Sequence, residues 1–570
     1  MHISKYKTFS LFLLLSLKTY SSSFFVSHNA SSNGDGSFNN PWQFQTALNH
    51  PVLLMPGDTV WLKGGTYTGT YMSNISFACK TKGTESKPII FRNYKNERVT
   101  IDGDLTYTLF CNVNECEYTW FWGIEFTNSS KTDRKQGRNG TVYCTAKNIK
   151  FINLIIHDMG SGIDCWKTAE NAEIYGCIIY HIGNNQLNGG NWEGHGHGMY
   201  LQNDTFGVKK IHNNFIFNTF GYGLKIWQTT TTAPIGNFDL QKNIIFNGGS
   251  ASENLGGIGN NYRTHNFFVL SNGSNNPLRN TVIKNNYTYS DPNQPRPPVN
   301  AFGLNYGVVN FILDSNFLTC QTRLGLSNTP VFQAKVTNNT FMAGIPAEYG
   351  YYLWGFLQTD YPQNNYVSAV PKSGLQYFIN QNKYEKDKFH LAIYNWDSLK
   401  TVEIDLSKNG FKTGEKYQLI NVMNYFSDTI NGTCFDNGKI SIPMTGHDCV
   451  NVNGSSQKPV NSFPKFGAFV LKKSNYIPNN TSISHNITEN KSIFVFPNPI
   501  SNSCTFFYNS NNDNNYKISI YNTLGKIIKT LEIINGKADF IRDSEQNGFY
   551  FYKLIYKGET ILAKGKLILN

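Results

Sequence analysis

Two short patterns of hydrophobic and polar positions alternate between Asn148 and Asn247. In the first, apolar residues at alternate positions lead to a polar residue and then to another apolar one, as in NIKFINLIIHD and KKIHNNFIFN. In the second, Gly-x-Gly is followed by apolar residues at alternate positions, as in GHGMYLQN and GYGLKIW. Because a period of two is typical of β-strands rather than of helices, each unit predicts short strands.

The polar residue of the first pattern recurs at intervals of 23 to 43 residues. Repeats of this size predict a solenoid, in which each unit buries its apolar face against its neighbours. An asparagine at one fixed place per turn indicates an interior ladder, whose amides bond to the next coil. The unequal intervals predict loops inserted on one side, where a solenoid carries its binding face. The expected ladder positions are Asn153, Cys177, Asn214, Asn243, Asn286, Asn316 and Asn339.

These repeats resemble the right-handed parallel β-helix of the pectate-lyase-like group. The segments PGDTVWLKGGTYTGTY (56–71) and KPIIFRNYKNERVTIDGD (87–104) are similar to the opening coils of secreted polysaccharide lyases with this fold. The resemblance covers roughly residues 33–341. We therefore expect an all-β protein whose residues 24–376 form a right-handed parallel β-helix.

Both ends of the chain predict export. Residues 1–23 contain two early lysines, an apolar stretch and small serines suited to cleavage, which is typical of a signal peptide. No other stretch is apolar and long enough to cross a bilayer. Residues 492–570 carry FVFPNP, YNTLGK and GFYFYKL in that order and resemble the immunoglobulin-like C-terminal sorting domain of the type IX secretion system. The expected partner is therefore the type IX machinery, and the expected location is outside the cell or on its outer surface.

Between the β-helix and this end, two further segments are expected. Residues 377–473 predict a small accessory β-sandwich, because FHLAIYNW and FGAFVLKK are strands of ordinary hairpin type. Residues 474–491, rich in Asn, Ser and Thr, predict a linker. The net charge of +12 favours an acidic partner. Together with the resemblance, this charge leads us to expect that the protein binds an acidic polysaccharide rather than nucleic acid. We also expect the protein to be a monomer.

The chain has ten cysteines, and in an exported protein cysteines can form disulfides. Cys111 with Cys116 and Cys434 with Cys449 are near enough in sequence to pair. Cys165 and Cys177 instead occupy positions that look interior, where buried free thiols are expected.

Alignment of the Gly-x-Gly strands gives the candidate binding face. Since side chains alternate along a strand, one column points inward and the next points outward. Adjacent strands lie about 4.8 Å apart, so neighbouring outward groups can contact one or two sugar rings. The inward column is Ile163, Met199, Leu224 and Ile258, and the first outward column is Asp164, Tyr200, Lys225 and Gly259. The second outward column, expected to bind substrate, is Trp166, Gln202, Trp227 and Asn261.

The resemblance implies β-elimination, in which a base removes the proton at C5 of a uronate and the 4-linked oxygen leaves. β-Helix lyases similar to this protein use Lys or Arg as the base, often with calcium. Lys225 is the expected base, with Arg263 as a nearby positive charge that would lower its pKa. Tyr200, His195 or His197 would return a proton to the leaving oxygen.

A calcium ion would neutralise the uronate carboxylate during this reaction. Oxygen ligands for it are offered by Asp164, Glu193 and Asp204, although these residues form no dense acidic motif. The histidine pair in NWEGHGHG could alternatively bind a metal, but its spacing is not that of a zinc helix.

Three other functions stay open. The order GIDCW, GHG, GLKIW superficially resembles polygalacturonases, which hydrolyse with paired acids, yet Ile163-Asp164 stands where two aspartates are expected. The arginine expected before Ile-Lys is also absent. A C5 epimerase would use the same proton abstraction as a lyase. A non-catalytic glycan-binding or adhesive protein would need only the stacking aromatic residues.

Overall fold

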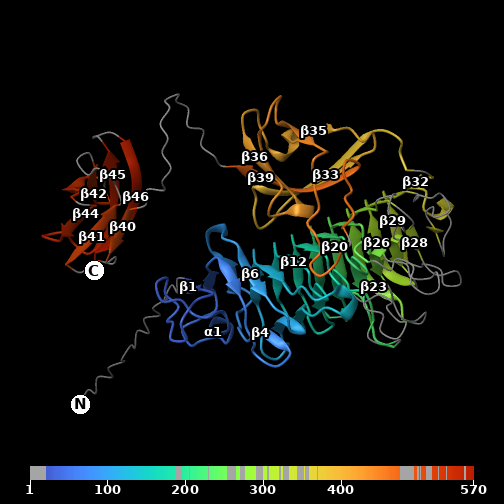
Figure 1. The fold of residues 1–570 in the computed structure, drawn as a ribbon, viewed down its shortest axis with the longest axis horizontal. Helices are drawn as coiled ribbons and strands as arrows, with labels where there is room; N and C mark the ends of the chain where they lie inside the picture. Colours follow the sequence, from blue (N-terminus) through green and yellow to red (C-terminus); the bar gives the residue numbers. More distant parts are fainter. Residues whose placement is uncertain are drawn as a thin grey trace, which may run out of the picture. The chain divides into compact units, whose positions relative to one another are not determined.

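A computed structural model describes residues 21–185, 196–252, 265–269, 276–290, 300–319, 322–324, 333–342, 352–353, 358–474 and 493–569, with short gaps at 205, 229, 231, 305–306, 369, 457, 497–499, 501, 509–515, 524, 535 and 557–559. The described chain is nearly all β-structure (Figure 1). It divides into two compact units, Met1–Tyr476 and Ile477–Asn570, each described here by itself.

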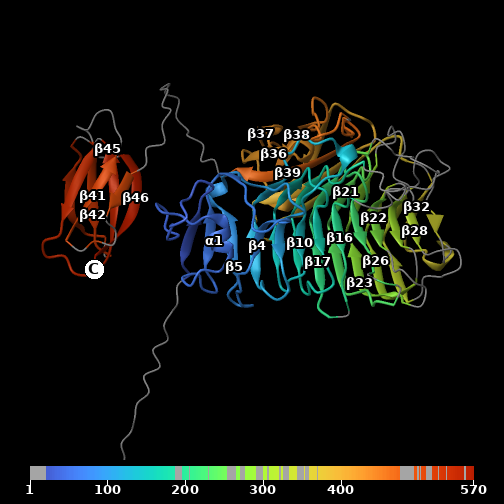
Figure 2. The same cartoon turned by 60° about the horizontal axis from the view of Figure 1, so that its bottom comes forward.

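Three parallel sheets run side by side through the described part of residues 23–367 and form a β-helix (Figures 1 and 2). Each coil adds one strand to each sheet, and that strand pairs in parallel with the coils before and after it. The all-β, parallel β-helix prediction is confirmed.

Sheet A contains, in spatial order, β1 (Ser23–Val26), β2 (Thr59–Leu62), β5 (Ile89–Asn93), β8 (Thr119–Trp122), β11 (Lys150–Ile152), β14 (Glu173–Tyr175), β17 (Lys209–His212), β20 (Phe238–Gln241), β23 (Leu278–Lys284), β26 (Val308–Asp314) and β29 (Ala334–Thr337). Sheet B contains β3 (Gly65–Tyr67), β6 (Val99–Asp102), β9 (Glu125–Thr127), β12 (Ile155–His157), β15 (Ile178–Tyr180), β18 (Phe215–Phe217), β21 (Ile244–Phe246), β24 (Tyr287–Tyr289), β27 (Phe317–Leu318), β30 (Thr340–Met342) and β32 (Asn365–Val367). Sheet C contains β4 (Ile75–Cys79), β7 (Tyr107–Cys111), β10 (Val142–Cys144), β13 (Ile163–Cys165), β16 (Met199–Leu201), β19 (Leu224–Ile226), β22 (His265–Val269), β25 (Asn300–Leu304), β28 (Thr322–Leu324) and β31 (Tyr352–Leu353).

Inward side chains of the three sheets form one long hydrophobic core. In sheet A, Phe91 stacks on Phe121 at 5.5 Å between ring centroids, and Phe121 stacks on Phe151 at 5.9 Å. The short helix α1 (Phe44–Leu48) buries Phe44 and Leu48 in the same core at its N-terminal end. Because apolar residues occupy every second strand position, each coil buries one side against its neighbours.

The predicted asparagine ladder is present from Cys177 onward. The Cys177 amide donates to Asn214 Oδ1 at 2.9 Å, and the Asn214 side-chain amide donates to Asn243 Oδ1 at 2.9 Å. The same bond repeats through Asn286, Asn316 and Asn339 and ends on Asn364, which the sequence analysis missed. Asn153 does not join this ladder, since its Oδ1 accepts a bond from Asn382 of the following domain.

That domain is the predicted β-sandwich. Its larger antiparallel sheet contains β33 (Leu375–Gln381), β34 (Lys388–Asn395), β39 (Phe466–Ser474), β36 (Lys416–Asn421) and β37 (Thr429–Thr433). The second sheet pairs β35 (Thr401–Asp405) with β38 (Lys439–Pro443). Short 3-10 helices lie in connections at η1 (Tyr94–Asn96), η2 (Arg134–Gln136), η4 (Gln358–Asp360), η5 (Ser407–Asn409) and η6 (Val422–Asn424).

The sandwich packs on the outward face of sheet B (Figure 1). Side chains of β15, β18, β21 and β24 form one buried cluster with side chains of β34 and β39. Within it, Tyr289 stacks on Phe466 with ring centroids 4.5 Å apart, and Tyr394 Oη donates to the Thr288 carbonyl at 2.8 Å. Along these strands the sandwich therefore covers the face of sheet B that would otherwise meet solvent.

A buried chain of charges strengthens this contact. His157 bonds to Glu125 through Nε2 and to Asp158 through Nδ1, both at 2.8 Å. Arg134 donates to Asp158 at 2.7 Å and to the Asn453 carbonyl of the sandwich at 2.6 Å. Burial lowers the pKa of His157, but the two carboxylates outweigh it and raise the pKa to about 9. The imidazole is therefore charged at neutral pH.

The C-terminal unit has two antiparallel sheets and its own hydrophobic core. One sheet contains β40 (Ile493–Phe496), β41 (Ser503–Tyr508) and β44 (Lys537–Ile541), and the other contains β43 (Ile527–Glu532), β42 (Tyr516–Tyr521), β45 (Gly548–Tyr556) and β46 (Thr560–Leu569). Such a two-sheet arrangement agrees with the predicted immunoglobulin-like domain.

Candidate functional site

The outward face of sheet C carries six in-register side chains, which we call the sheet C row. Tyr143 pairs with Asp164, Asp164 with Tyr200, and Tyr200 with Lys225. Phe110 precedes this series and Phe268 follows it. Ile163, Met199 and Leu224, on the alternate positions, are fully buried as predicted. The central four residues of the row remain partly exposed, unlike the covered face of sheet B.

The fourth strand of the predicted alignment is different. After β16, the second strand that pairs with β19 is β22. Phe268 therefore lies beside Lys225, and Phe267 continues the inward column. Ile258 and Gly259 were aligned at these two positions and lie outside the described residues. The Gly-x-Gly motif at 257–259 predicted the wrong partner for β19. The register is set by strand pairing between coils and not by the spacing of the motif.

Aromatic rings extend the row on the side of Tyr143. Phe110 and Tyr143 stack with ring centroids 5.3 Å apart and planes 10° apart. Trp166 lies against both Tyr143 and Tyr200, at 5.6 and 5.4 Å between centroids. Its indole Nε1 is buried and makes no hydrogen bond to the described residues. Stacked rings beside polar groups suit the apolar faces of a sugar chain.

Lys225 is held between two aromatic rings. Its Nζ lies 4.4 Å from the ring centroid of Trp227 and 4.9 Å from that of Tyr222. Tyr222 in turn stacks on Phe268 at 5.3 Å. Because ring faces attract an ammonium group, these contacts fix where the Lys225 amine lies in the row.

Asp164 has an unusual carboxyl environment. Its Oδ1 accepts a bond from Ser161 Oγ at 2.6 Å, and its Oδ2 accepts one from Thr141 Oγ1 at 3.1 Å. Burial raises the pKa of this carboxyl to about 6, although both hydroxyls oppose the rise. A carboxyl with such a pKa exchanges a proton near neutral pH.

Tyr200 is positioned by two predicted site residues. His197 stacks on it with ring centroids 5.4 Å apart, and Gln202 Nε2 donates to Tyr200 Oη at 2.9 Å. Burial raises the pKa of Tyr200, and the Asp164 carboxylate adds to the rise, while the Gln202 bond opposes it. Gln202 was expected in an outward column, but its side chain is only 3% exposed. Its bond to Tyr200 Oη places the Gln202 amide beside the outward phenol, which it orients.

Lys209 stabilises the backbone that carries the site, and its role was not predicted from the sequence. Its side chain is 0% exposed, and Nζ donates to the backbone carbonyls of Cys165, Trp166 and Gln202 at 3.3, 2.8 and 2.6 Å. It therefore binds the ends of β13 and β16, from which Trp166 and Gln202 follow. Lys209 is the first residue of β17, and the sequence gave no signal of its burial, because two consecutive lysines at 209–210 are typical of a solvent-exposed position.

Tyr143, Phe110, Tyr222 and Phe268 were also missed. VYC at 142–144 and IDC at 163–165 share their spacing, so extension of the alignment by one coil would have found Tyr143. Four predicted site residues lie outside the described residues: His195, Glu193, Arg263 and Asn261. Asp204 is partly buried beyond the end of β16.

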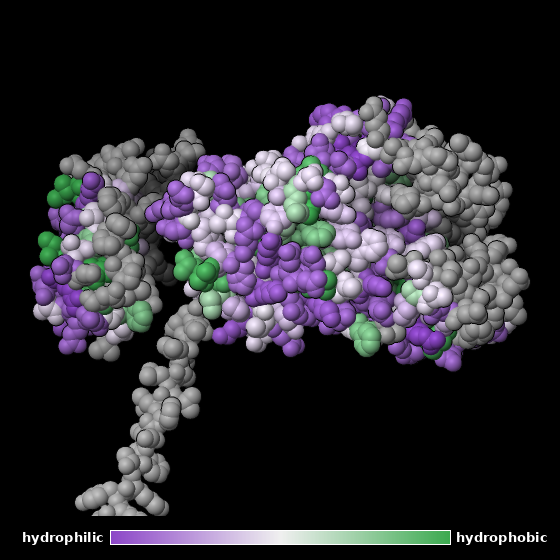
Figure 3. Space-filling model, turned by 90° about the horizontal axis from the view of Figure 1, so that it is seen from below, coloured by the Kyte–Doolittle hydropathy of each residue, from purple (hydrophilic) through white to green (hydrophobic). Residues whose placement is uncertain are grey.

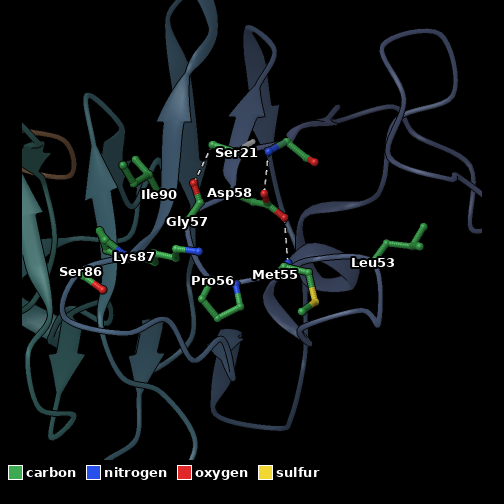
Figure 4. A pocket seen from close by; sticks show the side chains of 11 residues that line it. Ser21, Leu53, Met55, Pro56, Gly57, Asp58, Ser86, Lys87 and Ile90 are labelled. Carbon is green, nitrogen blue, oxygen red and sulfur yellow. Dashed lines mark hydrogen bonds between the residues drawn. The ribbon is translucent and has the colours of Figure 1, made fainter. Parts of the chain in front are cut away.

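A separate cavity of about 640 Å³ lies on the first coils, lined mainly by residues that precede β2 and β5 (Figure 4). Asp58 in its wall accepts bonds from the backbone amides of Ser22 at 2.6 Å and Met55 at 2.8 Å. None of the residues lining the cavity belongs to the sheet C row. The aligned side chains of sheet C are the candidate site, because they bring a carboxyl, a phenol and an amine into one row. Elsewhere, the face seen in Figure 3 is mainly hydrophilic, with hydrophobic side chains in small separate patches.

Two families match parts of the chain. Residues 24–196 match the model of the Pel9A-like, right handed β-helix region, and residues 494–570 match that of the secretion system C-terminal sorting domain. The chain therefore contains a region that is similar to Pel9A-like β-helices, and it contains the predicted C-terminal sorting domain. The sorting domain directs the protein to the cell surface or the extracellular space. In the described part of the chain, no helix has the length and apolar character needed to cross a membrane.

Individual relatives are distant from this chain. Pectate lyase PEL9 of Emericella nidulans is 33% identical over an alignment of 119 residues, which covers 18% of this chain and 27% of that protein. The crystal structure of pectate lyase Pel9A has a TM-score of 0.38 and 16% identity, covering 57% of this chain and 82% of that one. The GH136 lacto-N-biosidase from Eubacterium ramulus has a TM-score of 0.32 and 14% identity, covering 56% and 67%. The structural likenesses bear on neither substrate nor reaction.

Proposed function

We propose that this exported protein binds an acidic polysaccharide along the sheet C row and cleaves it by β-elimination. The observation that carries the proposal is the in-register series Asp164, Tyr200 and Lys225, flanked by Trp166 and Trp227. A carboxyl, a phenol and an amine lie on consecutive strands, about 4.8 Å apart. The sequence likeness of the Pel9A-like region to a pectate lyase supports a uronate-containing substrate.

In this mechanism Lys225 first loses a proton to solvent and then, as the neutral amine, removes the proton at C5 of the uronate. The electron pair left at C5 forms the C4–C5 double bond, and the 4-linked oxygen departs. The leaving oxygen needs a proton, which Tyr200 or protonated Asp164 can supply from the neighbouring strands. The rings of Tyr143 and Trp166 would hold the adjoining sugars by stacking.

The described residues give little support to a calcium ion. Calcium takes six to eight oxygen ligands, whereas both oxygens of Asp164 already accept bonds from Ser161 and Thr141. We therefore derive no step through calcium, and a chelator is one arm of the experiment below.

The test is ultraviolet absorbance of unsaturated uronate product when the mature protein is incubated with pectin, alginate, glucuronan or glycosaminoglycans, with and without chelator. We expect a rise on one substrate that Lys225→Ala abolishes. Lys150→Ala is the matched control, because Lys150 Nζ lies 4.3 Å from the ring of Trp120 on sheet A, a similar contact on a different face. Thermal unfolding of both variants verifies that they are folded.

Other outcomes would replace this proposal. New reducing ends without the absorbance rise, lost in Asp164→Asn, would indicate hydrolysis. Exchange of the C5 proton with solvent without chain cleavage would indicate a C5 epimerase. Glycan binding that needs Trp166 or Trp227, with no product of any kind, would indicate a non-catalytic binding protein.

A further inference from the structure

Three buried thiols meet at one end of sheet C. Cys79 ends β4 and Cys111 ends β7, and the two residues are register partners. Cys116 lies in the turn after β7, where the amide of Glu117 donates to the Thr81 carbonyl at 3.1 Å. All three side chains are 0% exposed, and their sulfur atoms lie within 4.8 Å of one another. The described cysteines are all free thiols in the structure.

We propose that Cys79 and Cys116 form a disulfide in the exported protein and that Cys111 remains a thiol. The Sγ atoms of Cys79 and Cys116 are in contact at 3.1 Å. Cys111 is a poorer partner for Cys79, because directly paired strands hold Cβ atoms about 4.8 Å apart, beyond the usual 3.5–4.5 Å of a disulfide. Cys116 is not a register partner of Cys79, since the bridge beside it pairs Glu117 with Lys82, so this restriction does not apply to Cys116.

Charge favours a disulfide over a metal ion in this cluster. Three thiolates around a divalent ion would leave a net negative charge inside an apolar core. The polar groups that bond to the cluster are the hydroxyl of Thr81, at 3.2 Å from Cys79 Sγ, and through it that of Thr119. Neither hydroxyl carries a compensating charge. A disulfide is neutral and apolar, so it suits this environment better.

The bridge forms by thiol–disulfide exchange, in which the thiolate of one cysteine, written here as Cys79, attacks a disulfide of the oxidant. The oxidant is a dithiol–disulfide protein of the cell envelope, met during export before the coil closes.

The exchange balances without another reactant. The Cys79 thiolate forms a mixed disulfide with the oxidant and releases one of its sulfurs as a thiolate. The Cys116 thiol then loses its proton and attacks Cys79 Sγ, which releases the second sulfur of the oxidant. The two cysteines lose two electrons and two protons, and the oxidant gains both as a dithiol. The product fastens the turn after β7 to β4, next to Phe110 of the sheet C row.

Mass spectrometry of the secreted protein tests the pairing. The protein is unfolded without reductant in the presence of an alkylating agent and digested with trypsin and a glutamate-specific protease. Cleavage after Glu115 separates Cys111 from Cys116. We expect a cross-linked pair of peptides containing Cys79 and Cys116, and alkylated Cys111. Three alkylated thiols, a bridge to Cys111, or zinc or copper at one ion per chain would each overturn the proposal.

Thermal unfolding with and without reductant is a second test of the disulfide. Each variant is compared with itself, so a change in its packing does not affect the shift of its midpoint. Reductant should lower the midpoint of the wild-type protein by a few degrees. Cys111→Ala should keep this reductant-dependent shift, and Cys116→Ala should lose it. Cys177→Ala is the matched control, since this buried thiol bonds to backbone carbonyls of Phe151 and Tyr175. Equal shifts in Cys116→Ala and Cys177→Ala would contradict the bridge.

Discussion

Lys209 gives a sharp test of how the site is supported. We consider Lys209→Met, which keeps the length of the side chain and removes the ammonium group. Three backbone carbonyls, of Cys165, Trp166 and Gln202, then lose a charged donor in a place that water does not reach. Hydrogen bonds to a charged group contribute about 1.5 kcal/mol each or more.

The methionine avoids the cost of burying a charge, which offsets part of this loss. Removal of one partner from a buried charged contact nevertheless costs about 3 to 5 kcal/mol, because the remaining groups stay unsatisfied. We therefore expect the free energy of unfolding of the β-helix unit to fall by about that amount.

Equilibrium urea unfolding, followed by circular dichroism, measures the change. The control is Lys210→Met, because Lys210 is the adjacent residue, points outward on the same strand and is exposed. Exposed substitutions of this kind usually change stability by less than about 0.5 kcal/mol. If the two variants unfold at the same urea concentration, the three carbonyl bonds do not stabilise the fold as argued.

Two pH dependences follow from the ionisable groups. The pKa of His157 is raised to about 9, so its stabilisation is complete below its ordinary pKa of about 6.5 and is lost as the pH rises through 9. The thermal midpoint should fall over this range, and His157→Gln should flatten the fall; equal slopes would count against the charged imidazole. The pKa of Asp164 is raised to about 6, so its contribution is present below about pH 4 and lost as the pH rises through 6. Asp164→Asn should therefore raise the midpoint at pH 8 more than at pH 4, and the same change at both pH values would refute the raised pKa.

The sequence by itself determined the repeating architecture. Alternation of apolar residues is a local property of each strand, so it predicted the β-helix and the buried column of Ile163, Met199 and Leu224. Asparagine at a fixed place predicted the ladder, because one side-chain amide, such as that of Asn214, can bond both to the preceding coil and to the following one. The ordered motifs of the sorting domain were also recognisable in the sequence.

Only the tertiary structure decided which groups lie together. Phe268 lies beside Lys225 because β22, which follows a long insertion, pairs with β19. The spacing of motifs along the sequence could not locate that strand. The sandwich covers sheet B, so the open face could not be known before the two domains were seen in contact. Lys209, and the contact of Cys79 with Cys116, depend on backbone and side-chain atoms from different coils. Such contacts are set by the stacking of the coils, which local sequence patterns do not contain.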